Sequence, residues 1–160
     1  MAMADRLFNR GQYEEAAKEY KSLAGQEGIA ADEILFRLAE CDRVAGRTAE
    51  ALKGYVELFT RHPESTHASR ARFLNAMGRT GLERRKLLAE LDSDRVDLET
   101  RTAALYHLGA EASDTEALEK CVKLAPKGKY APYANLKYGT ILNASTDPAV
   151  RRKGIEVLLG

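Results

Sequence analysis

The chain has 160 residues, of which 44% are hydrophobic and 31% are charged, a balance typical of a folded globular protein and not of a disordered one. Lysine and arginine total 25 against 24 for aspartate and glutamate, so the net charge of +1 provides no overall field to attract nucleic acid or an anionic membrane. No apolar run approaches the roughly 20 residues that span a bilayer, and the first residues do not resemble a signal peptide. The sequence leaves both the cytoplasm and the periplasm open as locations.

Apolar residues follow helical spacing along the chain, and no segment alternates as a strand would. Leu35, Leu38 and Ala39, for example, share one face of a helix. Turn residues interrupt this pattern twice in each period. We therefore predict helices at about 2–9, 12–24, 30–45, 48–61, 66–78, 81–92, 97–112, 114–125, 130–143 and 148–159. Each successive pair is expected to form an antiparallel hairpin.

A leucine recurs near the end of the second helix of each pair. These leucines are Leu23, Leu58, Leu91, Leu124 and Leu158, in steps of 35, 33, 33 and 34 residues. Such a period indicates one supersecondary unit copied along the chain, with each copy burying its apolar face against its neighbours. We predict an all-α fold, an α-solenoid of about five antiparallel hairpins in a single domain, 1–160. The repeats fall at about 1–28, 29–64, 65–95, 96–128 and 129–160.

Three predicted helix starts carry a side chain that can accept hydrogen bonds from the free amide groups of the first turn. Thr48, Asp114 and Asp147 are the expected capping residues. Pro148 would then occupy the first helical position, where its missing N–H costs nothing.

The sequence lacks the residue patterns of an enzyme or of a metal site. Its three histidines, His62, His67 and His107, have no ligand spacing, and Cys41 and Cys121 belong to no Cys-x-x-Cys motif. We therefore expect no catalysis, no cofactor and no metal. The two cysteines lie at different places in different repeats, so we expect buried thiols and not a disulfide.

Two stretches carry a family resemblance. They are Gly11-Gln12-Tyr13-Glu14-Glu15-Ala16 with Tyr20, and Leu38-Ala39 followed by Gly46, Ala51, Tyr55, Leu58 and Pro63. On these residues the chain resembles the tetratricopeptide repeat (TPR) proteins, whose period is about 34 residues. The resemblance implies a right-handed superhelix of hairpins. It also implies a non-catalytic scaffold that binds a peptide or partner protein in a concave groove lined by the first helix of each hairpin.

In the TPR pattern a small residue lets the two helices of a hairpin approach closely. Ala16, Ala51 and Ala117 occupy this position in repeats one, two and four. Arg84 and Arg151 occupy it in repeats three and five. There, either the hairpin register slips, or the arginine stem packs while its charged head reaches water.

Two proline-led helix starts, residues 63–71 and 126–134, are similar to those of bacterial cell-envelope TPR proteins of the Tol–Pal accessory and outer-membrane assembly lipoprotein types. At the other end, no polar closing helix follows Leu158 and Leu159, although terminal repeats normally need one. We expect the chain to be the N-terminal part of a longer protein, or its open end to associate with another copy.

Transferring the TPR groove onto this sequence gives one aromatic residue per repeat. The predicted partner-binding residues are Phe8, Phe36, Phe73, Tyr106 and Tyr133, with Glu33, Glu40 and Arg43 beside Phe36. These rings would anchor a bound segment, or they would instead fill the seams between hairpins. Some TPR proteins grip a C-terminal carboxylate with lysine and asparagine side chains. The corresponding residues here are Asp5, Glu40, Phe73, Tyr106 and Thr140, so that type of ligand is disfavoured.

Two identical basic triplets lie two repeats apart, and so at equivalent places. They are Arg84, Arg85 and Lys86, and Arg151, Arg152 and Lys153. As an alternative function, they would bind nucleic acid or another polyanion. No aromatic residue accompanies them to stack on bases, so solvated helix faces are the simpler interpretation. A protein or peptide in the groove is the leading hypothesis, and the sequence does not identify that partner.

Overall fold

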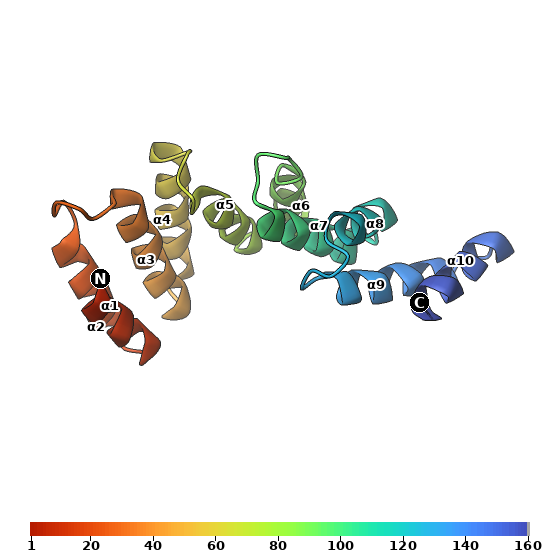
Figure 1. Ribbon diagram of the computed structural model, residues 1–160, viewed down its shortest axis with the longest axis horizontal. Coiled ribbons are helices and arrows are strands. Elements are labelled where there is room, and N and C mark those ends of the chain that lie inside the picture. Colours follow the sequence, from red (N-terminus) through yellow and green to blue (C-terminus); the bar gives the residue numbers. More distant parts are fainter. Residues whose placement is uncertain (160) are drawn as a thin grey trace. The chain divides into compact units, whose positions relative to one another are not determined.

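The computed structural model of the chain describes residues 1–159, which form ten α-helices and no strand (Figure 1). Their bounds are α1 Ala2–Asn9, α2 Tyr13–Leu23, α3 Ala31–Val44, α4 Thr48–Arg61, α5 Ala68–Met77, α6 Gly81–Ala89, α7 Leu98–Ala112, α8 Thr115–Leu124, α9 Ala131–Asn143 and α10 Pro148–Leu159. Each overlaps a predicted helix and ends within three residues of the predicted bounds. The all-α prediction is confirmed. Within residues 1–159, no helix has both the length and the apolar character needed to cross a lipid bilayer.

The chain divides into two compact units, Met1–Arg79 and a second unit that begins at Thr80. Within the N-terminal unit, each of α1 to α4 packs on the helix that follows it. Within the C-terminal unit, α6 to α9 do the same, and α7 also contacts α9. This neighbour-to-neighbour packing is typical of a solenoid. The boundary falls inside the third predicted repeat, 65–95, and the single domain with its repeat boundaries stays a prediction.

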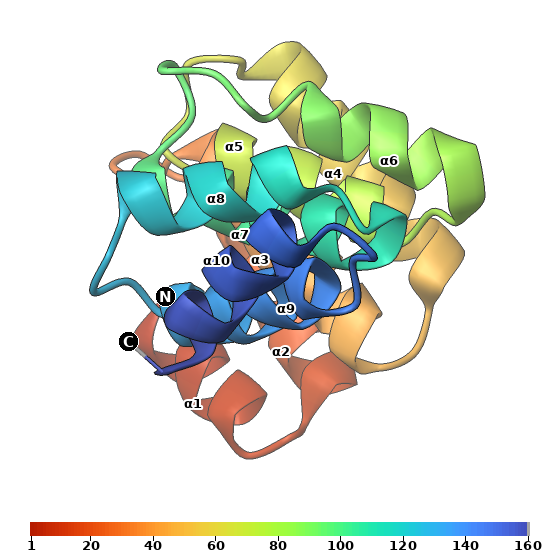
Figure 2. The same cartoon turned by 90° about the vertical axis from the view of Figure 1, so that its right-hand side faces the viewer.

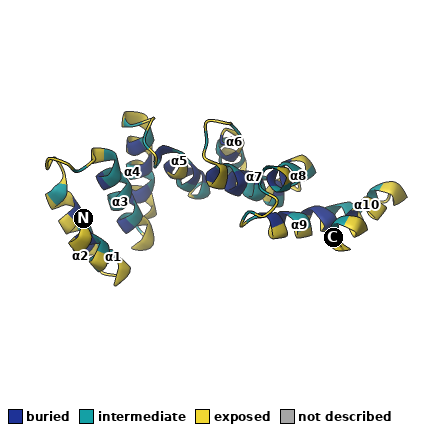
Figure 3. Ribbon diagram, in the orientation of Figure 1, coloured by how far each residue is buried: buried dark blue, intermediate teal, exposed yellow. Residues whose placement is uncertain are grey.

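The apolar core of each unit lies in the seams between successive helices (Figure 3). One cluster joins α1, α2 and α3 around Tyr20, and a second joins α3, α4 and α5 around Tyr55 and Leu58. In the C-terminal unit, a cluster joins α7 to α10 around Leu118 and Tyr138. Because every seam needs both of its helices, no hairpin buries its apolar surface alone.

The small residues of the repeat pattern lie where neighbouring helices meet. Ala16, Ala51 and Ala117 are 0%, 2% and 5% exposed. A larger side chain at these positions would push the two helices apart. The small residues therefore permit the close approach that the sequence predicts in repeats one, two and four.

In the fifth repeat the close approach lies three residues further along α10. Arg151 is exposed, and Gly154 is the buried residue instead. A Cβ atom on Gly154 would lie 2.5 Å from the backbone nitrogen of Asn143 and 2.9 Å from the carbonyl oxygen of Gly139. The absence of a Cβ atom at this position lets α9 and α10 pack closely, and the two helices lie side by side in Figures 1 and 2. Of the two alternatives for Arg151, the structure supports the slipped register.

The helix starts only partly match the predicted caps. Asp114 accepts hydrogen bonds from the backbone of Glu116 and Ala117, at 3.0 and 3.1 Å, and Asp147 accepts one from the backbone of Ala149 at 2.8 Å. These two predictions are confirmed, and Pro148 is the first residue of α10. The prediction for Thr48 is wrong, because Arg47 occupies the capping position and Thr48 is already helical. A cap that the sequence analysis missed is Asp97, which accepts from the backbone of Thr100 at 2.9 Å.

Cys41 and Cys121 are both buried and free, as predicted. Burial raises the pKa of each thiol to about 11. Both thiols therefore stay protonated at neutral pH and serve as small apolar residues of the seams.

Candidate protein-interaction surface

Each of the first two hairpins contains a hydrogen bond from its second helix to its first helix. The Tyr20 hydroxyl on α2 donates to a carboxylate oxygen of Asp5 on α1, at 2.6 Å, and the Tyr55 hydroxyl on α4 donates to Glu40 on α3. The second pair follows the first by 35 residues, which is one repeat. Asp5 and Glu40, which the family resemblance aligns with carboxylate-binding positions, form hydrogen bonds inside their own hairpins.

Glu40 is surrounded by donors. Arg43 donates two hydrogen bonds to its carboxylate, at 2.8 and 2.9 Å, and Tyr55 donates a third. Burial raises the pKa of Glu40, but the hydrogen bonds from Arg43 and Tyr55 outweigh burial and hold the pKa below its ordinary value. Glu40 is therefore charged at neutral pH, and its oxygens are engaged within the N-terminal unit.

Phe36 on α3 stacks on the ring of His67, the residue before α5, with ring centroids 4.6 Å apart and planes at 10°. Atom Nε2 of His67 lies 2.6 Å from one carboxylate oxygen of Glu33, and Arg37 donates to the other oxygen at 2.7 Å. Burial raises the pKa of Glu33, while the hydrogen bonds from Arg37 and His67 outweigh it and lower the pKa. These contacts hold Phe36 between α3 and α5 with one face of its ring covered.

The other two phenylalanines of the predicted groove differ in exposure. Phe8 on α1 is half-buried and packs edge-on against Tyr13, with ring centroids 5.3 Å apart. Phe73 on α5 is only 4% exposed, and the guanidinium of Arg70 lies 5.3 Å from its ring centroid. A side chain buried to this extent offers little area to a ligand, so Phe73 contributes to the core.

In the C-terminal unit, three tyrosines form a cluster of rings at α7 and the start of α9, and we call it the tyrosine cluster. The ring centroid of Tyr106 lies 5.4 Å from that of Tyr130 and 6.2 Å from that of Tyr133. His107 meets Tyr130 edge-on at 6.1 Å, and the ammonium of Lys129 lies 5.6 Å from the same ring. Burial lowers the pKa of His107, so its ring is neutral at pH 7. Tyr106 and Tyr133 were predicted from the sequence as site residues, and Tyr130 was not.

One side of α9 carries large apolar side chains that face solvent. Tyr133 is 57% exposed and Leu136 is 62% exposed. Lys137 and Thr140 are exposed as well, and the spacing of the four residues places them on one face of the helix. We call these four residues the α9 stripe, and it adjoins the tyrosine cluster through Tyr133. Helical spacing from Tyr133 was the signal in the sequence that could have identified Leu136.

The two basic triplets lie on α6 and α10. Arg84 pairs with Glu111 of α7, and the ammonium of Lys153 lies 3.5 Å from Glu119 of α8. The remaining members are Arg85, which is half-buried, and Lys86, Arg151 and Arg152, which are exposed. Internal carboxylates thus neutralise one member of each triplet, which reduces the charge available to a polyanion.

In the C-terminal unit, the carboxylate of Asp92 is paired with two bases. Asp92 accepts a hydrogen bond from Arg101 at 2.9 Å and another from Lys120. Burial raises the pKa of Asp92, but the bonds from Lys120 and Arg101 outweigh burial and lower the pKa. This network connects the loop that precedes α7 with helix α8. In the described part of the chain, 1–159, no group of three histidine, cysteine, aspartate or glutamate side chains is arranged to hold a metal ion.

Comparison with known proteins identifies the class of fold. No protein family and no curated protein matches the sequence. Solved structures do match, and they show that the chain has the fold of TPR-like repeat proteins. This confirms the resemblance that the sequence suggested.

Two of these solved structures contain the nearly identical TPR-like repeats of a protein described as a kinesin light chain from Podosopora anserina, and one of them carries a single substitution. The TM-scores are 0.65 for the substituted form and 0.63 for the other, with 16% and 17% sequence identity. Each alignment covers 99% of the present chain and 89% of the other chain. At this identity the likeness establishes the fold and says nothing about ligands. TPR-like repeats generally serve as non-catalytic scaffolds for protein interactions.

Proposed function

We propose that this chain is a non-catalytic scaffold that binds a peptide or a segment of a partner protein along the first helices of its hairpins. The anchor of this site is the tyrosine cluster together with the α9 stripe. The observation that carries the proposal is the exposure of Tyr133 and Leu136 on a helix that buries Ala134 and Tyr138 on its other side. Large apolar side chains that lie together in water mark interaction sites.

The chemistry of the α9 stripe suits this role. A tyrosine ring has only two rotatable bonds, so it provides contact area at a small cost in conformational entropy. The contact with Tyr106 restricts the Tyr133 ring further before any ligand binds. Leu136 adds aliphatic area, and Lys137 offers a positive charge to an acidic group of the ligand. In the N-terminal unit, Phe8, Phe36, Glu40 and Arg43 stay proposed contacts, whereas Phe73 is too buried to take part.

Affinity selection from a displayed peptide library, with the 160-residue chain as bait, tests the proposal. The selected peptide is then titrated by calorimetry against the chain and against the double variant Tyr133→Ala and Leu136→Ala. We expect binding to weaken by at least about tenfold, because anchor residues cost more than about 1 kcal/mol when truncated. The unfolding free energy should change by less than about 0.5 kcal/mol per site, because both side chains are exposed.

The control is Leu82→Ala, which removes a leucine that is 77% exposed on α6 of the same unit. Its affinity should match that of the unchanged chain. Equal affinities for the double variant and the control would refute the site, and a collapse in stability of the double variant would show that the two residues are core. Binding that instead weakens steeply with salt and depends on Arg151 and Arg152 would favour the polyanion alternative.

A further inference from the structure

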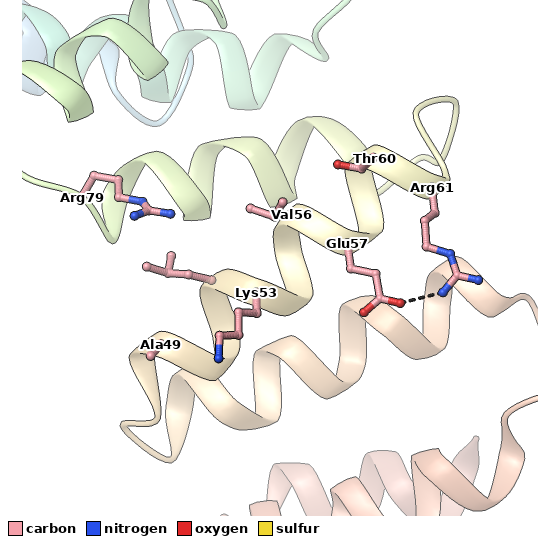
Figure 4. A pocket seen from close by; sticks show the side chains of 8 residues that line it. Ala49, Lys53, Val56, Glu57, Thr60, Arg61 and Arg79 are labelled. Atoms are coloured by element: carbon pink, nitrogen blue, oxygen red, sulfur yellow. Dashed lines mark hydrogen bonds and ion pairs between the residues drawn. The ribbon is translucent and has the colours of Figure 1, made fainter.

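A second exposed apolar surface lies in the N-terminal unit, along the outer side of α4 (Figure 4). A groove of about 600 Å³ extends along this helix from Ala49 to Arg61, and Arg79, just after α5, also lines it. Leu52 and Val56 provide its main apolar lining, and Val56 is 38% exposed. Lining residues recur every three or four positions along α4, so they form one continuous face of the helix.

The dimensions and the lining of the α4 groove favour a helix as its occupant. From Ala49 to Arg61 the helix rises by about 18 Å, a length that about three turns of a second helix would match. An extended segment would place backbone N–H and C=O groups against Leu52 and Val56, which offer no hydrogen-bond partners, and such unpaired groups are costly. A helix satisfies its own backbone and packs its side-chain ridges into the groove.

The charged residues around the groove are mainly basic. Lys53, Arg61 and Arg79 line it together with a single acid, Glu57. Glu57 pairs with Arg61 at 2.6 Å, as Figure 4 shows. Because Glu57 neutralises Arg61, the lining keeps a net positive charge, to which Lys53 contributes an exposed ammonium group. Acidic residues beside the apolar stripe of an incoming helix would therefore meet a complementary surface.

The same charges argue against a second copy of this chain as the occupant. The three most exposed leucines are Leu82, Leu136 and Leu159, on α6, α9 and α10. Each of these helices has more basic than acidic residues, with a single acid on α6 (Glu83), a single acid on α10 (Glu156) and none on α9. Docking any of them into the α4 groove would bring this excess of positive charge against a basic surface, which costs binding energy. We propose that the α4 groove is the docking site for an amphipathic helix of a partner protein whose apolar stripe is flanked by acidic residues.

Two synthetic peptides of about 14 residues, long enough to cover the face of α4, test this proposal. Both have the same leucine stripe and the same helix-stabilising side-chain staple. The flanking positions are glutamate in one peptide and lysine in the other. Binding to the full chain is measured by fluorescence anisotropy, and amide chemical shifts locate the site. We expect the glutamate peptide to bind at least about tenfold more tightly than the lysine peptide and to shift the amides of α4.

Two variants of the groove sharpen the test. Val56→Asp should weaken binding of the glutamate peptide by about tenfold, because the substitution removes apolar contact and adds a repulsive charge. Lys53→Glu reverses the charge of an exposed side chain, so this variant still tests the proposal if Val56→Asp lowers stability. Lys53→Glu should also weaken binding of the glutamate peptide and strengthen binding of the lysine peptide. The matched control is Leu82→Asp on α6, a leucine that is 77% exposed, and it should leave both affinities unchanged.

Several results would overturn the proposal. They are no binding by either peptide, equal binding of both, and affinities that do not respond to Val56→Asp and Lys53→Glu. Loss of binding in a further variant, Leu136→Asp, with binding kept in Val56→Asp, would place the peptide on the α9 stripe instead. Sedimentation that shows self-association of the unchanged chain, abolished by Val56→Asp, would make a second copy the occupant. The α9 stripe and the α4 groove belong to different units, so failure at one site leaves the other proposal standing.

Discussion

Replacing Tyr55 by phenylalanine removes one hydroxyl group from the core of the N-terminal unit and leaves the ring in place. Tyr55 is 1% exposed, and its hydroxyl donates to the charged carboxylate of Glu40. A hydrogen bond to a charged group contributes about 1.5–3 kcal/mol. Glu40 keeps both hydrogen bonds from Arg43, and its side chain is 17% exposed, so water can replace part of the lost bond. We therefore expect Tyr55→Phe to lower the unfolding free energy by about 2 kcal/mol.

Urea denaturation followed by circular dichroism at neutral pH measures this change. The matched control is Tyr133→Phe, which removes a hydroxyl from an exposed ring and should change the unfolding free energy by less than about 0.5 kcal/mol. Tyr20→Phe removes the corresponding bond to Asp5 one repeat earlier, and it should destabilise in the same direction. A loss below about 0.5 kcal/mol for Tyr55→Phe would refute the view that this bond stabilises the hairpin.

Two further predictions concern packing and pH. Gly154→Ala should speed hydrogen exchange of the α10 amides, because the new Cβ atom would lie 2.5 Å from the backbone nitrogen of Asn143. Alanine otherwise stabilises a helix by about 1 kcal/mol relative to glycine, so slower exchange would contradict the close approach. Acid should weaken the N-terminal unit. The pKa of Glu33 and that of Glu40 lie below the ordinary 4.5, so the stability these groups contribute is complete above that value and is lost as the pH falls through the lowered pKa. Glu40→Gln should therefore flatten the decline of the melting temperature below about pH 5, and an unchanged decline would refute this assignment.

The helices and their order could be predicted because the relevant signals are local. Helical spacing of apolar residues and the turns between them determine where each helix begins and ends. The period of the leucines also identified the fold, and Leu58 and Leu91 are buried as a repeat requires. A period says less about packing at a given copy. Leu158 fits the period, yet it is 40% exposed, because α10 packs on α9 through Gly154 in a slipped register.

The candidate site was harder to predict, because the rotation of each helix about its own axis decides which side chains meet. Register alone assigned Glu40 and Phe73 to the groove. The structure engages Glu40 with Tyr55, 15 residues away, and buries Phe73. Tyr133 was assigned by the same rule and is exposed. The rule gave these different outcomes because it takes no account of the neighbouring helix that covers or leaves open each position.

The paired acid and tyrosine in the first two hairpins also limit how this protein could change its ligand. A substitution of Glu40 by lysine would introduce the residue type that grips a terminal carboxylate. It would also leave the buried Tyr55 hydroxyl without its acceptor and place two cations, the new lysine and Arg43, side by side at a partly buried position. The substitution would therefore destabilise the hairpin. Evolution of this sequence toward binding a C-terminal carboxylate would need stabilising changes elsewhere in the chain first.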